Sequence, residues 1–265
     1  MQPGEGFESI AMKQLILIGA SNVTIAFPRL VSGLAHAVGD PLQIWGIHGH
    51  GRSYGGWSRV LGRSLPGITD SRFWDAWQPA EDGMRPRAVL TDIGNDILYG
   101  HDADRILEWI ETCLKRLQSL DADTVMTRLP LASLESLSPI RFALARRILF
   151  PSCNLSLAKI RQQAHELDAG VIALADKYSI PLTKPEGNWY GIDPIHIRGR
   201  FMEPAWQKIL GKWFSTDHPP KFPRVGLRRA LKTWRWWPAE RGCCGRITET
   251  AQPVFEYNRL SVHLY

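Results

Sequence analysis

Four polar residues of this 265-residue chain have the types and spacing that hydrolysis through a serine nucleophile requires. Ser21 follows the apolar run LILIG, Asn95 follows a second apolar run, and Asp193 stands three residues before His196. An imidazole can take the proton of a serine hydroxyl, and a carboxylate can hold that imidazole in the required tautomer. Because an amide N–H can stabilise the oxyanion that develops, these residues together predict acyl transfer.

The segment HGHGRSYGG, at residues 48–56, places histidines and glycines after another apolar run. The backbone N–H groups of Ser21 and of one of these glycines can serve as further oxyanion donors. We expect His48 and His50 to line the substrate pocket. Trp189 is a further candidate for substrate binding, although core packing is the commoner role of a tryptophan.

Strands and helices alternate along the first 214 residues, and these elements must bring the polar side chains together. Apolar runs predict strands at residues 14–19, 42–47, 88–93, 123–128 and 180–183, and helical periodicity predicts helices at residues 25–38, 104–120, 155–178 and 199–214. Asp102 or Asp104 is expected to cap the second helix, and Asn154 the third. Such alternation is typical of a three-layer α/β domain with a parallel sheet of about five strands. Because function gathers at the carboxyl ends of parallel strands, the polar segments are expected to meet at one edge.

These segments resemble the four sequence blocks of the SGNH, or GDSL-like, hydrolase family. The blocks are LILIGASN, HGHGRSYGG, DIGNDILYG and DPIHI, and they follow one another in the family's order between residue 14 and about residue 200. The resemblance implies a flavodoxin-like fold with a central parallel sheet. It also implies that Ser21 is the nucleophile, His196 the base and Asp193 the residue that orients the base.

The resemblance further implies an oxyanion hole made by Ser21, Asn95 and a glycine of the second block. The family spacing favours Gly51, and Gly49 is the alternative. Two positions depart from the family pattern: Ala20 stands where the first block usually has Asp, and Ile93 where the third block usually has Gly. The missing Asp supports the family's site without reacting, so its loss weakens the resemblance modestly.

The same residues also allow interpretations other than this catalytic one. A lone serine at a strand–helix junction is usually a helix cap, and Ser21 could have that role. A non-catalytic protein that keeps the fold is therefore the main alternative. An α/β-hydrolase is not favoured, because Val23 stands where its Gly-x-Ser-x-Gly motif needs the second glycine.

Composition restricts the class of protein. With 44% hydrophobic and 22% charged residues the chain can bury a sizeable core. It has no apolar run of the roughly 18–20 residues that span a membrane, and no persuasive signal peptide. Its four cysteines do not suggest a disulfide framework, so we expect reduced thiols and a cytoplasmic location. His48, His50 and His101 lack a carboxylate at a metal-ligand spacing, and neither a metal nor an organic cofactor is predicted.

The last 51 residues differ from the rest in charge and composition. Residues 215–265 contain nine Lys or Arg against four Asp or Glu, which is most of the chain's net charge of +6. We therefore divide the chain into a catalytic domain, residues 1–214, and a basic, Trp-rich C-terminal extension, residues 215–265. Leu227, Ala230, Leu231 and Trp234 have the spacing of an amphipathic helix. The extension is expected to bind an anionic membrane surface or an acidic partner, and nucleic acid is not favoured because no nucleic-acid motif accompanies it.

The sequence thus predicts a serine-dependent ester hydrolase that works through an acyl-enzyme. Its substrate is expected to be a small-molecule, carbohydrate or lipid acyl ester.

Overall fold

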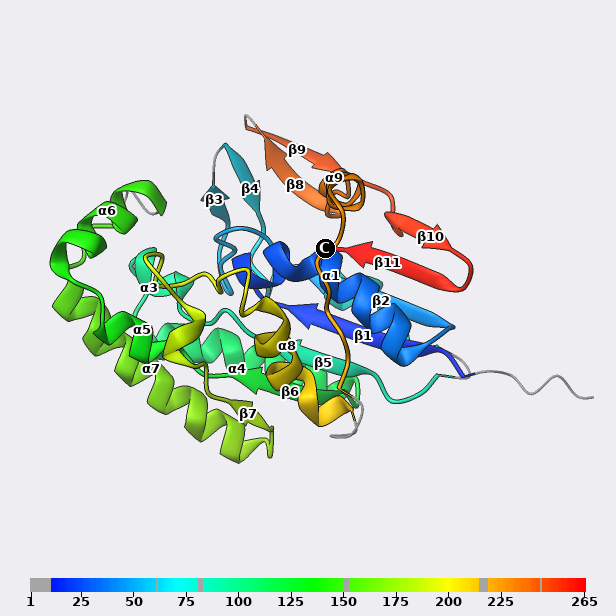
Figure 1. Ribbon diagram of the computed structural model, residues 1–265, viewed down its shortest axis with the longest axis horizontal. Coiled ribbons are helices and arrows are strands. Elements are labelled where there is room, and N and C mark those ends of the chain that lie inside the picture. Colours follow the sequence, from blue (N-terminus) through cyan, green and yellow to red (C-terminus); the bar gives the residue numbers. More distant parts are fainter. Residues whose placement is uncertain (1–10, 61, 81–82, 150–152, 215–218, 244) are drawn as a thin grey trace, which may run out of the picture.

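The computed structural model describes residues 11–60, 62–80, 83–149, 153–214, 219–243 and 245–265. Its centre is a seven-stranded sheet with the strand order β10-β11-β2-β1-β5-β6-β7 (Figure 1). The strands of this sheet are β1 (Lys13–Ile18), β2 (Leu42–Ile47), β5 (Arg87–Leu90), β6 (Asp123–Thr127), β7 (Leu182–Thr183), β10 (Phe255–Tyr257) and β11 (Leu260–Leu264). All neighbours pair in parallel except β10, which is antiparallel to β11. The prediction of an α/β fold with a central parallel sheet is confirmed, and all five predicted strands are present.

Helices cover both faces of this sheet, which gives the expected three layers. The helices are α1 (Ser21–Val38), α2 (Phe73–Ala76), α3 (Asn95–Leu98), α4 (Ala103–Ser119), α5 (Leu131–Glu135), α6 (Pro139–Leu149), α7 (Leu157–Lys177), η1 (Gly187–Trp189), α8 (Met202–Leu210), η2 (Gly211–Trp213) and α9 (Leu227–Trp234). One core cluster joins α1 and α8 to Leu15 and Leu17 of β1. The other joins α4 and α7 to Ile16 and Ile18 of the same strand. Alternate residues of β1 therefore enter opposite cores, as expected for a strand buried on both faces.

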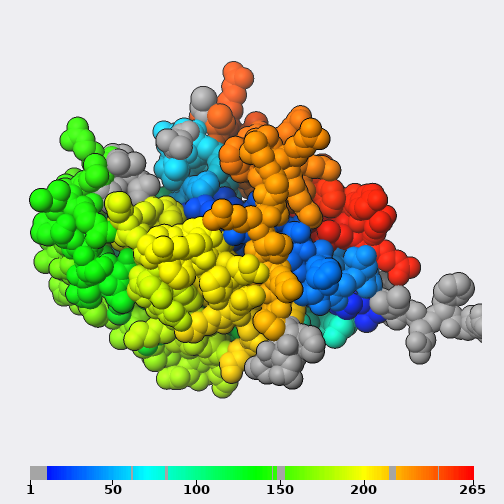
Figure 2. Space-filling model, viewed as in Figure 1, coloured from blue at the N-terminus to red at the C-terminus, as the bar shows by residue number. Residues whose placement is uncertain are grey.

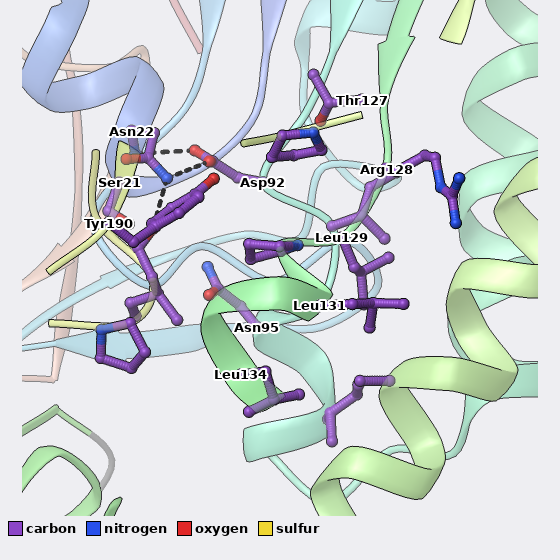
Figure 3. A pocket seen from close by; sticks show the side chains of 18 of the residues that line it. Ser21, Asn22, Asp92, Asn95, Thr127, Arg128, Leu129, Leu131, Leu134 and Tyr190 are labelled. Carbon is purple, nitrogen blue, oxygen red and sulfur yellow. Dashed lines mark hydrogen bonds between the residues drawn. The ribbon is translucent and has the colours of Figure 1, made fainter. Parts of the chain in front are cut away.

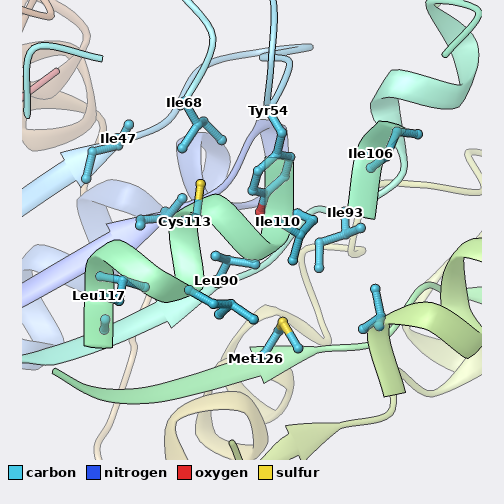
Figure 4. Packing of buried hydrophobic residues seen from close by; sticks show 14 of the residues in the cluster. Ile47, Tyr54, Ile68, Leu90, Ile93, Ile106, Ile110, Cys113, Leu117 and Met126 are labelled. Atoms are coloured by element: carbon cyan, nitrogen blue, oxygen red, sulfur yellow. The ribbon is translucent and has the colours of Figure 1, made fainter. Parts of the chain in front are cut away.

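The packing on the second face shows why α4 was recognisable from its sequence. Figure 4 shows Ile110, Cys113 and Leu117 of α4 among side chains of the sheet, including Leu90 and Met126. These residues follow a helical spacing of three and four, so they form one apolar stripe. Burial in this stripe raises the pKa of the Cys113 thiol to about 12.

One of the predicted helix caps is present in the structure, and another is not. The Asp102 side chain accepts a hydrogen bond of 2.8 Å from the Arg105 N–H and caps α4 as expected. Asn154 does not cap α7, because the hydroxyl of Ser156 accepts from the Lys159 N–H at 3.2 Å instead. The prediction for Asn154 is wrong because two capping residue types lie two positions apart, and the helix starts after the second.

A second, antiparallel sheet joins the middle of the chain to its C-terminal part. It contains β3 (Ser58–Val60), β4 (Arg63–Leu65), β8 (Glu240–Cys243) and β9 (Arg246–Glu249), in that order. The pairing of β4 with β8 places the segment after the second polar block beside residues that lie about 180 positions later.

The C-terminal strands belong to the central sheet. β11 pairs in parallel with β2, and its Val262 and Leu264 are buried in the core that contains α1. The sheet therefore has seven strands where about five were expected, because β10 and β11 join it. The physical reason is that β2 offers an unpaired edge, which β11 covers. The boundary predicted near Ser215 falls on residues 215–218, outside the described residues, and stays a prediction.

Candidate active site

Ser21 is the first residue of α1 and follows directly on the end of β1. Only 5% of its surface is exposed, the N-cap position of α1 is Ala20, and the Ser21 hydroxyl forms no hydrogen bond within the described part of the chain. The position gives it the positive end of the α1 dipole. Capping is therefore not the role of this serine in the structure.

Asp92, at the end of β5, caps α1 from the neighbouring strand. Its Oδ2 accepts hydrogen bonds from the backbone N–H groups of Ala20 at 2.8 Å, Asn22 at 2.9 Å and Val23 at 3.3 Å. Asp92 reaches them from a left-handed backbone conformation, φ 59°, which Asp tolerates better than most residues. In the described part of the chain the N–H of Ser21 has no acceptor. Asp92 therefore leaves the Ser21 N–H unused, and this is the backbone donor that the resemblance assigns to the oxyanion hole.

Asp193 and His196 form a hydrogen-bonded pair. The His196 Nδ1 lies 2.5 Å from Asp193 Oδ2, and the other carboxylate oxygen accepts the backbone N–H groups of Ile195 and His196 at 3.0 and 3.2 Å. Burial raises the pKa of Asp193, but the hydrogen bond and charge of His196 and the two N–H groups lower it more, so the pKa lies below its usual value. A charged Asp193 can hold the imidazole with Nε2 as its basic nitrogen.

Asn22, the residue after Ser21, connects these two parts of the site. Its Nδ2 donates to Asp92 Oδ1 at 2.8 Å and to the Ile195 carbonyl at 2.9 Å, and its Oδ1 accepts from the Ile197 N–H at 2.8 Å (Figure 3). One amide therefore holds the backbone on both sides of His196. The two described residues Ser21 and His196 share no hydrogen bond in this structure, so their proton transfer stays a prediction. Catalytic hydrogen bonds are often long until substrate binds.

Asn95 is positioned by a glycine turn at the end of β5. Gly94 has φ 127°, a conformation that other residues rarely adopt, and it directs the chain into α3, which begins at Asn95. The Asn95 Nδ2 is buried without a hydrogen-bond partner and lines the same cavity as Ser21. In Figure 3 its amide points away from α3 into this cavity. A buried donor without an acceptor is costly, so this donor is available for an oxyanion.

Asp96, in the segment DIGNDILYG, forms hydrogen bonds to the segment HGHGRSYGG. Its Oδ1 accepts from the Ser53 hydroxyl and its Oδ2 from the Tyr54 N–H at 3.0 Å. Burial raises the pKa of Asp96 although both hydrogen bonds lower it. Asp96 thus holds the second and third polar segments together.

Gly51 lies in a turn between Gly49 and Arg52, closed by a 3.1 Å hydrogen bond from the Arg52 N–H to the Gly49 carbonyl. Its φ of 61° explains the need for glycine at the third position of this turn. The hydroxyl of Tyr99 donates to the Gly51 carbonyl at 2.5 Å, while the Gly51 N–H has no acceptor in the described part of the chain. This agrees with a donor role, but the choice between Gly51 and Gly49 stays a prediction.

The three predicted substrate-binding residues line two different cavities. Trp189 is buried in the core cluster that contains α1 and α8. It also lines a cavity of about 130 Å³ together with Ser21 and Asn95. His48 and His50 line a separate cavity of about 610 Å³ on the other side of the first turn of α1. The structure therefore does not bring the two histidines together with Trp189.

His48 and His50 differ in their surroundings. The Thr24 hydroxyl donates to the Ala20 carbonyl at 2.7 Å, so its oxygen accepts from His48 Nδ1 at 3.0 Å. Burial, followed by the charges of Arg52 and His50, lowers the pKa of His48 to about 3 and keeps the ring neutral. Burial and the charges of Arg63 and His196 lower the pKa of His50, which shows that His50 lies within electrostatic reach of the His196 imidazole.

Sequence reasoning missed Asp92 and Asn22. Both are polar residues at the carboxyl end of a strand that is otherwise apolar, and that position was the available signal. No group of three His, Cys, Asp or Glu that could hold a metal ion occurs among the described residues. None of the described helices is long and apolar enough to cross a membrane.

Comparisons with known proteins point to the fold. No protein-family model matches the sequence, and a search of curated proteins finds no match. A carbohydrate acetylesterase family member from Sinorhizobium meliloti matches with a TM-score of 0.52 and 16% identity, over 76% of this chain and 97% of that chain. An acetyl xylan esterase, AlAXEase, matches with a TM-score of 0.50 and 14% identity, over 76% of this chain and 100% of that chain. The chain therefore has the fold of these esterases, as the resemblance to the SGNH hydrolases implied.

Proposed function

We propose that the protein is a serine-dependent ester hydrolase. The observation that carries the proposal is Ser21 itself, a buried serine in the first turn of α1 whose hydroxyl has no hydrogen-bond partner among the described residues and whose neighbour Asn22 holds the His196 segment. In the proposed reaction His196 takes the proton of Ser21 as the hydroxyl attacks the ester carbonyl, and Asp193 keeps the imidazole oriented. The alcohol leaves with that proton, and water then attacks the acyl-enzyme with His196 as base.

The N–H of Ser21, the amide of Asn95 and the N–H of Gly51 are proposed to stabilise the oxyanion. Each lacks an acceptor in the described part of the chain. Donors that are already oriented stabilise the developing charge without reorganisation at the moment of reaction. No metal or organic cofactor has a role in this scheme.

The cavity beside Ser21 supports a short acyl group. It has a volume of about 130 Å³, and most of its lining is apolar, including Ile93, Leu129 and Leu134. The two matching structures are, by their descriptions, a carbohydrate acetylesterase family member and an acetyl xylan esterase, which supports an acetyl ester as the substrate. Carbohydrate, lipid and small-molecule alcohols all fit the proposal.

Release of p-nitrophenol from p-nitrophenyl acetate tests the proposal. The protein should hydrolyse this ester, and Ser21→Ala should abolish turnover because the nucleophile is lost. Ser119→Ala, an exposed serine on α4, is the matched control and should keep full activity. Equal rates for Ser21→Ala and the unaltered protein would leave the non-catalytic alternative as the better description.

We also propose contact with an anionic membrane surface, through α9. Leu227, Leu231 and Trp234 lie along one side of this helix and are 73%, 45% and 71% exposed. The same helix and its end carry four cations, Arg228, Arg229, Lys232 and Arg235. Exposed apolar residues among cations are typical of helices that bind anionic lipid. Leu231→Gln with Trp234→Gln should reduce binding to phosphatidylserine vesicles in a co-sedimentation assay, and unchanged binding would refute this part. A cytoplasmic location stays a proposal that rests on cysteine usage.

A further inference from the structure

The larger cavity, of about 610 Å³, is lined by five stretches of the chain: residues 24–29, 48–50, 63–65, 224–238 and Leu264. We name it the arginine cleft after Arg29 on α1, Arg63 on β4 and Arg224 before α9, which all line it. His48 and the exposed His50 line it as well. In Figure 2 blue atoms from the start of α1 are visible in a hollow between the cyan, orange and yellow surfaces. The C-terminal part of the chain thus completes a cleft next to the residues of the candidate active site.

The arginine cleft gathers positive charge, and no Asp or Glu lines it. Among the described residues the side chains of Arg29, Arg63 and Arg224 form no ion pair within 4 Å. Burial and the charge of Arg224 lower the pKa of Arg29, although Glu203 raises it in part. Burial and the charge of Arg241 lower the pKa of Arg63. A bound anion would relieve this repulsion, because opposite charge stabilises each guanidinium.

The wall opposite α1 supplies flat apolar surfaces. Trp236 is held by Phe255, whose ring is stacked on it with centroids 5.2 Å apart, and the Phe27 ring meets it edge-on at 6.4 Å. Trp237 also lines the cleft, with the Arg241 guanidinium 3.5 Å from its ring centroid. A ring that carries an anionic group can contact a tryptophan face while its charge meets the arginines.

The apolar cavity includes Ser21 itself, and the cleft begins one turn further along the same helix. Thr24, one turn after Ser21 on the same helix, lines the cleft, and His50 is within electrostatic reach of both Arg63 and His196. If the acyl group occupies the apolar cavity, the alcohol part of the ester extends toward the arginines. This orientation rests on the proposed function.

We propose that the arginine cleft binds an anionic group, a carboxylate, phosphate or sulfate, carried by the alcohol part of the ester substrate. The anion pairs with Arg63 and Arg224 at the mouth of the cleft and with Arg29 on α1. The ring or chain that carries it contacts the tryptophans. The cleft thus gives the enzyme a preference for negatively charged esters.

Two esters that differ in one charge test the inference. 4-Acetoxybenzoate carries a carboxylate, and 4-acetoxybenzamide has a neutral amide in its place. Arg63→Gln with Arg224→Gln should lower kcat/KM for the benzoate by about 10-fold or more, since a hydrogen bond to a charged group contributes about 1.5–3 kcal/mol. The same double variant should leave kcat/KM for the benzamide within about 2-fold, which also shows that it is folded. Lys159→Gln with Lys184→Gln removes two charges from exposed positions outside the cleft and should change neither value.

A binding measurement separates failure of the inference from failure of the proposed function. Ser21→Ala protein, titrated with 4-acetoxybenzoate in a calorimeter, should bind it more weakly when Arg63 and Arg224 are also replaced. If the unaltered protein hydrolyses neither ester, the proposed function fails, and this titration still decides the cleft. Equal loss on both esters, or equal binding with and without the arginines, would overturn the inference.

Binding to phosphatidylcholine vesicles, with and without phosphatidylserine, shows whether the anion is a lipid headgroup or part of a soluble ester. If the cleft variant binds the anionic vesicles less than the lysine control, a lipid headgroup is the natural anion. If both bind equally while the cleft variant loses its preference for the benzoate, the anion belongs to a soluble ester. Salt should weaken the preference in either case, because it screens charges near the surface.

Discussion

The strand-end edge, made by residues 19–22, 92–96 and 193–197, and the C-terminal part, residues 219–265, contribute to the same region of the molecule in different ways. At the strand-end edge, buried strands deliver polar residues one after another, and hydrogen bonds between residues far apart in the sequence hold them. The C-terminal part supplies a strand to the sheet, a wall to the arginine cleft and an exposed helix. The first provides the reacting groups, and the second shapes the surroundings in which they would act.

Residues of the strand-end edge and residues of the C-terminal part should respond differently to substitution. Substitutions at the strand-end edge should change the rate of the reaction with little effect on the fold. Substitutions in the strands of the C-terminal part should change the free energy of unfolding, and those in its cleft should change the choice of substrate. The predictions below test this separation, beginning with the largest expected effect.

Ser21 and His196 should act as one unit. Ser21→Ala or His196→Ala alone should lower kcat by about 10⁴-fold or more, and the double variant should lose little further, because neither group works without the other. Steady-state rates on p-nitrophenyl acetate measure this. Two fully additive losses would show that the residues are not partners.

Asn95→Ala should lower kcat by about 10²–10³-fold with a smaller change in KM, since the amide acts on charge that develops in the transition state. Asn95→Asp is a useful comparison, because it keeps the size of the side chain and removes the donor. A loss confined to KM would place Asn95 in ground-state binding. A liganded structure with the amide far from the Ser21 hydroxyl would refute the oxyanion role.

Much of the strand-end edge could be predicted because each signal was local. LILIG reads as a buried strand and Ser21 follows it, and Asp193 and His196 are near neighbours in the chain. Asp92 and Asn22 could not be assigned, because their roles depend on contacts across 70 and 173 residues. Asp92 accepts a hydrogen bond from the N–H of Ala20, the residue that stands where the family's first block usually has Asp.

Leu264→Ala should lower the free energy of unfolding by about 2–5 kcal/mol, as expected for a leucine removed from a packed core. Leu264 is buried on β11, which lies between β10 and β2 in the sheet. Leu231→Ala, on the exposed side of α9, is the matched control and should change it by at most about 0.5 kcal/mol. Urea denaturation measures both. Equal small effects would show that β11 is a detachable strand after all.

The same contacts predict what a truncation after Phe214 would do to the stability of the protein. It removes β10 and β11, exposes the edge of β2 and takes away the Tyr265 carbonyl that accepts from the buried Arg52. The truncated protein should therefore be insoluble or melt at a lower temperature. Charge and tryptophan content suggested an extension, because composition does not show which strand a short segment will pair with. The alternation of apolar Leu260, Val262 and Leu264 with polar Ser261 and His263 was the signal for a strand.

Asn22→Leu should lower kcat by up to about 10²-fold with KM nearly unchanged, because it frees the backbone on both sides of His196 and a small displacement of a base is costly. In a Ser21→Ala background the same change should have no further effect on the residual rate. A purely structural role would instead lower the melting temperature and leave kcat of the folded fraction unchanged. Rate and melting measurements on the same samples separate the two.

His48 should make the fold sensitive to acid. Its pKa is about 3 in the folded protein, against about 6.5 in an unfolded chain. Between these values the unfolded chain binds a proton that the folded protein excludes, so stability is complete above about pH 6.5 and is lost as the pH falls. From pH 7 to pH 5 this loss amounts to about 2 kcal/mol.

His48→Gln should remove that part of the pH dependence, while His36→Gln, an exposed histidine on the same side of the sheet, should leave it intact. Urea denaturation at pH 7 and pH 5 measures the difference for each protein. His263, whose pKa burial lowers to about 4, contributes in the same direction in all three proteins, so the comparison isolates His48. If His48→Gln and the unaltered protein lose equal stability between the two pH values, the neutral, buried state of His48 is refuted. His48, which lines the arginine cleft, would then carry a proton near neutral pH, and its charge would add to that of the arginines.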